Sequence, residues 1–157
     1  MKKPMCIVSA CLAGVNCRHD GCNKLDPRVA KLVAEGRAIP VCPEQLGGLP
    51  TPRTEADLVG GTGAEVLDGK ARVVDREGHD VTAQFVRGAR EALQVAKTAG
   101  ATLAVLKENS PSCGCKRTYT RDATGKAHRV AGQGVTAALL AREGLRVISE
   151  EELTQET

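Results

Sequence analysis

The sequence predicts an α/β fold: a three-layer, mainly parallel, Rossmann-like sheet with a small β-ribbon insertion near residues 65–74. Short apolar runs, typical of buried strands, alternate along the chain with amphipathic segments of helical period. Such an alternation indicates right-handed crossovers between parallel strands. The chain has 157 residues, a common length for one domain, so we expect a single domain over residues 1–157.

The first part of the chain supplies two strands and a helix. An apolar run predicts a strand over residues 6–10, followed by a long polar loop. A helix is expected over 27–35, because Asp26 is a favourable N-cap residue and Pro27 suits the first turn. A second strand is expected over 38–41.

The second part begins with the ribbon, in which Asp68-Gly69 stands between two extended runs and indicates a tight hairpin. Residues 80–99 keep their apolar positions at helical spacing and form the strongest predicted helix. A continuous apolar run over 102–106 predicts a strand that is buried on both faces. The remaining expected elements are a short helix over 135–142, a strand over 145–148 and an acidic tail over 150–156.

Three cysteines come after predicted strands: Cys11, Cys42 and, in the loop after residue 106, Cys113. The carboxyl ends of parallel strands share one edge, so the three should meet there although 31 and 71 residues separate them. Three thiolates without a fourth leave one coordination position open, as in a 4Fe-4S cubane whose free iron acts as a Lewis acid. On spacing alone, the alternative that these cysteines are buried small hydrophobic residues stays open.

The other cysteines and the composition narrow the class of protein. There are seven cysteines but no Cys-x-x-Cys, which argues against a structural zinc site with paired ligands and against a thiol redox pair. Cys17, Cys22 and Cys115 are expected to have loop or spare roles, with a second metal on the Cys-x4-Cys pair of Cys17 and Cys22 as the alternative. With one Phe, one Tyr and no Trp, the chain lacks the stacking platforms of many nucleic-acid-binding modules, so no nucleic-acid partner is expected.

The expected location depends on what the sequence lacks. No stretch approaches the roughly 18 consecutive apolar residues of a membrane span. The apolar run after Met1-Lys2-Lys3 is too short for a signal peptide. We therefore expect a cytoplasmic protein without a membrane partner, in a compartment where thiols stay reduced. The oligomeric state is left open.

Four segments together resemble a known family. They are SACLAG at 9–14, CRHDG at 17–21, CPEQLGGLPTPR at 42–53 and KENSPSCG at 107–114. In their order they are similar to the thiouracil desulfurase family, formerly a bacterial domain of unknown function. The resemblance spans essentially the whole chain.

The resemblance implies an iron-sulfur enzyme. It implies a 4Fe-4S cluster on Cys11, Cys42 and Cys113, with the sulfur of a thiolated pyrimidine, such as a 2-thiouracil-like base or nucleoside, binding the open iron. Water then adds at the carbon, and hydrosulfide leaves without any change of oxidation state. Glu44 and Ser110 match the catalytic positions of the family.

The residues leave plainer roles open as well. Glu44 is suited to moving protons beside the cluster, but it is alternatively an ordinary loop carboxylate, and Ser110 before Pro111 is alternatively a turn or cap residue. The competing interpretation of the chain is a non-catalytic metal- or nucleotide-binding module with a structural cluster or zinc. Its glycine pairs lack the context of a Walker or dinucleotide-binding motif.

Overall fold

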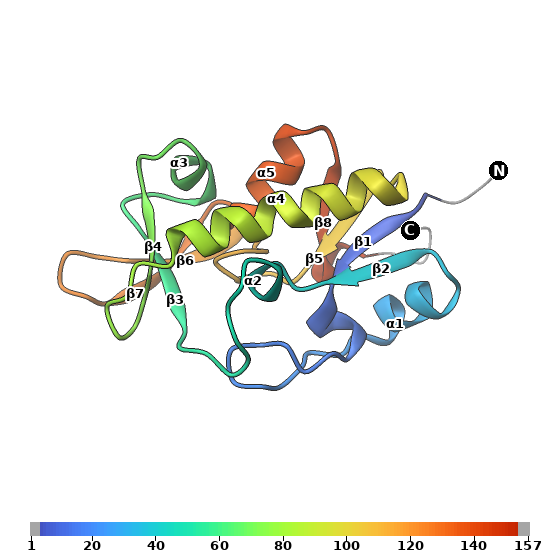
Figure 1. The fold of residues 1–157 in the computed structure, drawn as a ribbon, viewed down its shortest axis with the longest axis horizontal. Helices are drawn as coiled ribbons and strands as arrows, with labels where there is room; N and C mark the ends of the chain where they lie inside the picture. Colours follow the sequence, from blue (N-terminus) through green and yellow to red (C-terminus); the bar gives the residue numbers. More distant parts are fainter. Residues whose placement is uncertain (1–3, 154–157) are drawn as a thin grey trace.

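A computed structural model describes residues 4–153, which form two four-stranded sheets spanned by one long helix (Figure 1). Residues 1–3 and 154–157, including the end of the predicted acidic tail, lie outside the described residues. Between residues 4 and 153, no helix combines the length and the apolar character needed to cross a lipid bilayer.

The first sheet, sheet A, is entirely parallel. Its strands, in spatial order, are β2 (Ala38–Val41), β1 (Cys6–Ser9), β5 (Leu103–Leu106) and β8 (Arg146–Ser149). Ser9 lies opposite Val41, and Leu106 lies opposite Ser149. Since β1 and β5 pair at the same level, all four strands end at one edge. The predicted parallel sheet is confirmed.

Helices cover both faces of sheet A, which confirms the three-layer arrangement. On one face, α1 (Pro27–Ala34) packs its Val29 and Leu32 against Cys6 and Val8 of β1. On the other face lie α4 (Thr82–Ala99) and α5 (Val135–Arg142). The successive residues of β1 are buried on alternate sides of the sheet, as the continuous apolar run predicts.

The second sheet, sheet B, is mixed and was not predicted as a sheet. Its strands, in spatial order, are β4 (Arg72–Asp75), β3 (Ala56–Val59), β6 (Arg117–Arg121) and β7 (Ala127–Ala131). The β6 and β7 strands form an antiparallel hairpin, and β3 joins it through the parallel pairing of Leu58 with Thr120. The hairpin is polar and half-exposed, so no apolar run marks it.

The ribbon near 65–74 has a different first arm from the predicted one. Its expected first strand is instead α3 (Gly63–Leu67), which begins with a capping box between Thr62 and Glu65. Gly69, at a φ of 75°, comes after the end of this helix and does not connect two strands. The predicted hairpin is therefore wrong in its first strand and its turn, and β4 pairs antiparallel with β3, which lies before the predicted segment.

Three short helical elements come directly after strand ends of sheet A. They are the 3-10 turn η1 (Ala10–Ala13) after β1, the helix α2 (Pro43–Leu46) after β2 and the 3-10 turn η2 (Glu150–Glu152) after β8.

Helix α4 spans both sheets (Figure 1). Phe85 and Ala89 pack into the core of sheet B, whereas Leu93 and Ala96 pack into that of sheet A. Near its middle, α4 touches α2 backbone to backbone: a Cβ built on Gly88 would lie 1.9 Å from the carbonyl oxygen of Pro43. The position of α2 therefore depends on a glycine in α4.

We predict that Gly88→Ala destabilises the protein by about 1–3 kcal/mol, because the added methyl forces the two helices apart. This cost outweighs the gain of up to about 1 kcal/mol that alanine brings to a helix interior. Urea unfolding measures the difference, with Arg87→Ala on the exposed face of α4 as the control. A Gly88→Ala variant as stable as the parent contradicts the prediction.

Candidate functional site

A cavity of ≈ 730 Å³ lies between the carboxyl edge of sheet A and sheet B. Its walls include every predicted site residue: Cys11, Cys42, Cys113, Glu44 and Ser110. Ligands of parallel α/β sheets commonly bind outside this edge. The structure therefore brings together residues that are far apart in the sequence.

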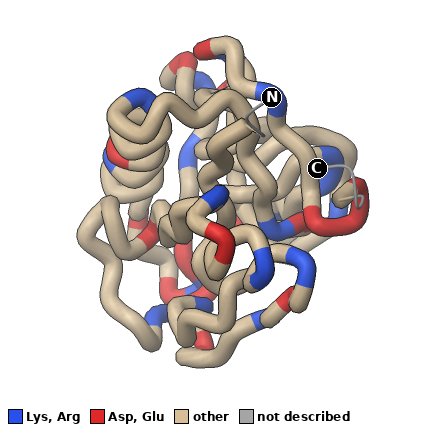
Figure 2. The backbone as a smooth tube through the Cα atoms, turned by 90° about the vertical axis from the view of Figure 1, so that its right-hand side faces the viewer, with Lys and Arg blue, Asp and Glu red and all other residues tan. Residues whose placement is uncertain are grey.

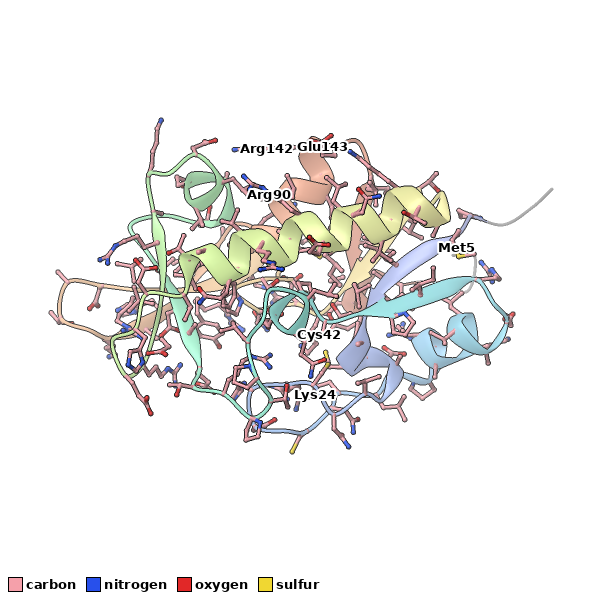
Figure 3. The ribbon with its side chains drawn as sticks, viewed as in Figure 1. Met5, Lys24, Cys42, Arg90, Arg142 and Glu143 are labelled. Atoms are coloured by element: carbon pink, nitrogen blue, oxygen red, sulfur yellow. The ribbon has the colours of Figure 1, made fainter. Side chains whose placement is uncertain are left out.

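The three cysteines reach the cavity from three strand ends. Cys11 lies in η1 and Cys42 stands between β2 and α2, while Cys113 belongs to the segment 107–116, here called the cysteine loop. Figure 3 shows Cys42 at the tip of the β2 arrow. Cys11 and Cys113 are buried, Cys42 is half-buried, and all three thiols are free.

The donor set fits a cluster better than a single ion. Within residues 4–153, no group of three His, Cys, Asp or Glu side chains is arranged to hold one metal ion. In a cubane cluster each thiolate binds a different iron, so the sulfurs surround the cluster and do not converge on one point. Three free thiols in the wall of one cavity provide the number and kind of donors that such a cluster needs.

The thiols need a positive partner to ionise. Burial raises the pKa of Cys11 to about 11, and the nearby Glu44 carboxylate adds to this rise. Burial likewise raises the pKa of Cys113 well above its usual value. Both thiols are therefore protonated at neutral pH unless bound iron compensates the charge of the thiolates.

A fourth thiol lies beside the set. Cys17 is 2% exposed, lines the cavity, and its carbonyl oxygen accepts a hydrogen bond from the Cys42 thiol at 3.7 Å. It is thus a buried neighbour of a predicted ligand and not a residue of an open loop. Cys22 is exposed, and Cys115 is buried outside the cavity lining.

Glu44 is paired with Arg53, which the sequence reasoning did not single out. The Nη2 atom of Arg53 lies 3.3 Å from a Glu44 carboxylate oxygen, and both side chains are largely buried. Arg53 also donates a hydrogen bond to Thr51 Oγ1 at 3.1 Å. Both residues belong to the 42–53 motif, but their contact depends on the reversal of the chain after α2, where Gly48 has a φ of 96°.

Ser110 caps the turn that carries Cys113. Its Oγ accepts hydrogen bonds from the backbone N–H groups of Ser112 at 3.1 Å and Cys113 at 3.0 Å. These contacts correspond to the cap role that the sequence left open. A catalytic role of Ser110 stays a prediction, which its place in the cavity wall permits.

Glu108 organises the cysteine loop and was also missed. It is 2% exposed, and one carboxylate oxygen accepts N–H groups from Cys115 at 2.8 Å, Lys116 at 3.0 Å, Arg117 at 3.0 Å and Asn109 at 3.3 Å. Burial by itself raises its pKa, but these donors outweigh burial and lower the pKa below its usual value. The available signal in the sequence was the position of this glutamate inside the 107–114 motif.

The cavity wall opposite the cysteines is polar and comes from sheet B. Glu55, Asp57 and Tyr119 line it. Asp57 is almost fully buried, and its carboxylate lies 2.9 Å from the Arg121 guanidinium. His19 pairs with Glu55 at 2.7 Å. The cavity lining therefore combines thiols from the edge of sheet A with hydrogen-bonding groups from sheet B.

Comparisons with known proteins agree with this arrangement. The sequence profile of the family described as 2-thiouracil desulfurase matches residues 6–152. A Bacillus subtilis (strain 168) protein called YbbK, whose function is uncharacterised, is 48% identical over 149 residues, which is 95% of this chain and 97% of that protein. A solved structure, the 4Fe-4S-dependent thiouracil desulfidase TudS, superposes with a TM-score of 0.82 at 46% identity and covers 96% of this chain and 93% of its own.

We predict that Glu108→Gln lowers the free energy of unfolding by about 1–3 kcal/mol at neutral pH, since a neutral amide accepts the same N–H groups more weakly. The folded-state pKa of Glu108 is lowered from 4.5, so its stabilising effect is complete above that value and is lost as the pH falls through the folded-state pKa. The difference between parent and variant should therefore shrink below pH 4.5. Denaturant unfolding of the metal-free proteins from pH 7 to pH 3 measures it, and a constant difference contradicts the role of the charge.

Proposed function

The chain belongs to the 2-thiouracil desulfurase family, and we propose on this premise that it is a 4Fe-4S-dependent enzyme that desulfurates a small thiolated pyrimidine base or nucleoside. The reaction replaces a thiocarbonyl sulfur by oxygen: the thiocarbonyl compound and water give the carbonyl compound and hydrogen sulfide. No electron donor is needed, because no oxidation state changes. Membership of the family and the likeness to TudS support desulfidase activity.

The observation that carries the proposal is that the five predicted site residues, which supply the three thiols, the Glu44 carboxylate and the Ser110 hydroxyl, all line a single cavity. Cys11, Cys42 and Cys113 would hold the cluster. When bound, a cluster on three protein thiolates supplies an iron that is free to attract a soft sulfur atom. The polar groups that sheet B contributes to the lining would then bind the rest of the pyrimidine.

The protein's own contribution is proton transfer and orientation. Glu44, a carboxylate in the cavity lining, would take a proton from the attacking water and return one to the departing sulfur or to a ring nitrogen. Arg53 holds the Glu44 carboxylate in the cavity wall through their ion pair. Ser110 lines the same cavity and stabilises the turn at Cys113 by accepting the Cys113 N–H.

Reconstitution with iron and sulfide under anaerobic conditions should yield about four irons per chain, because three thiolates suffice to hold a cubane. Cys11→Ala, Cys42→Ala and Cys113→Ala should each abolish iron uptake. The matched controls are Cys22→Ala and Cys115→Ala, which do not alter the cavity lining and should retain the cluster. Iron analysis and visible absorption measure the outcome. Stoichiometric zinc without iron uptake would falsify the cluster assignment.

The reconstituted protein should release sulfide from 2-thiouracil or its nucleoside without an added reductant. Glu44→Gln should keep the cluster spectrum but lower turnover by about a hundredfold, since the amide cannot transfer the proton. The control is Glu143→Gln, at an exposed position after α5 that Figure 3 shows far from Cys42. If a cluster-loaded Glu44→Gln variant kept the parental turnover, the proton would have to be transferred by Ser110 or by water.

A further inference from the structure

The cysteine loop is held from outside by the turn η2 at the end of sheet A. Each of the three consecutive glutamates of this turn contacts a residue at one end of the loop or just beyond it. Figure 2 shows these glutamates as the red stretch just before the C-terminus. None of the three lines the cavity.

Glu150 makes the least exposed of these contacts. One of its carboxylate oxygens accepts the backbone N–H of Glu108 at 2.8 Å. The other lies 3.2 Å from the Lys107 ammonium, which also donates to the Glu108 carbonyl oxygen at 3.0 Å. The Glu150 side chain is 14% exposed. Both of its oxygens therefore bind the start of the cysteine loop.

The partners of Glu150 then define the far end of the loop. Glu108, whose backbone Glu150 holds, gathers the N–H groups of residues 115–117 on its own carboxylate. The Glu108 side chain thus joins the two ends of the loop around Cys113, and Glu150 binds the backbone N–H of this same residue. The neighbouring pair of Glu151 with Arg117 is more exposed and is expected to contribute little.

Glu150 is anchored independently of the loop. The turn η2 comes after β8, and the Ser149 hydroxyl caps it by accepting the Glu151 N–H at 3.1 Å. From α1, Arg28 donates to the carbonyl oxygens of Glu150 at 3.0 Å and Leu153 at 2.8 Å. The turn is therefore fixed to both sheet A and α1, and can act as a support.

We propose that Glu150 is a positioning residue of the site: through Lys107 and Glu108 it holds the two ends of the cysteine loop and so keeps Cys113 at the cavity. The proposal rests on the proposed function in that Cys113 is taken as a cluster ligand. The middle of the loop is held separately, because the N–H groups of Val135 and Thr136 bind the carbonyl oxygens of Pro111 and Ser112. Loss of Glu150 should accordingly loosen the ends of the loop without unfolding the protein.

The first test is hydrogen–deuterium exchange on metal-free Glu150→Ala, which reports on the loop whether or not a cluster forms. The amides of Glu108 and of residues 115–117 should exchange about tenfold faster, as expected for the loss of a hydrogen bond to a charged group. Those of Val135 and Thr136 should keep their parental rates. Glu151→Ala, which removes only the exposed pair, should stay within about twofold of the parent everywhere.

The second test uses the reconstituted protein and a chelator. Cluster absorbance should decay about tenfold faster in Glu150→Ala than in the parent, because an opened loop presents Cys113 to solvent. Glu150→Gln should give an intermediate rate, since it still accepts the Glu108 N–H but has no charge for Lys107. It also replaces the alanine variant in both tests if that variant does not fold.

Two results overturn the proposal. One is parental exchange at Glu108 and residues 115–117 in the Glu150 variants. The other is an equal acceleration in Glu151→Ala, which would indicate a general effect of surface charge. Failure of the parent to bind iron contradicts the proposed function, whereas the exchange result still decides whether Glu150 holds the loop.

Discussion

The site depends on the parallel pairing of the strands of sheet A. Because Ser9 pairs with Val41, and Leu106 with Ser149, the four strands end at one edge of the sheet. The four segments that follow these strands therefore all begin at this edge. The segments after β1, β2, β5 and β8 are short and fixed: they are η1, α2, the cysteine loop and η2. Parallel pairing thus turns distant segments of the sequence into neighbours. The three predicted cysteine ligands and the glutamate that supports the loop all come from this single alignment.

The fold of sheet A could be predicted because its signals are local. In the sequence, the buried strand β1 is a short apolar run, and α4 shows helical spacing over its whole length. The predicted bounds of both elements therefore lie close to the observed ones. Sheet B gave no comparable signal, since β6 and β7 are polar strands stabilised mainly by pairing with each other. The prediction of a hairpin at Asp68-Gly69 was wrong because the same dipeptide suits both a hairpin turn and the end of a short helix.

In the candidate site, too, some residues could be predicted from local motifs and others could not. The cysteines, Glu44 and Ser110 could be named because each stands in a motif that comes after a strand, and the structure places them in one cavity. The ion pair of Arg53 with Glu44 and the hydrogen bond from Glu108 to Glu150 could not be predicted. The partners are 9 residues apart in the sequence in the first contact and 42 in the second. Each contact therefore depends on the path of the chain between them. Such contacts result from three-dimensional geometry and leave no periodic trace in the sequence.

The two strand pairs of sheet B are both insertions into the sheet A framework. One pair, β3 and β4, lies between α2 and α4, and the other, β6 and β7, lies between β5 and α5. Together they supply the polar wall of the cavity, whereas the thiols come from the edge of sheet A. Changes in the length or composition of these insertions can therefore reshape the polar wall while the strand ends of sheet A keep their spacing. The two sides of the cavity can thus change independently of each other.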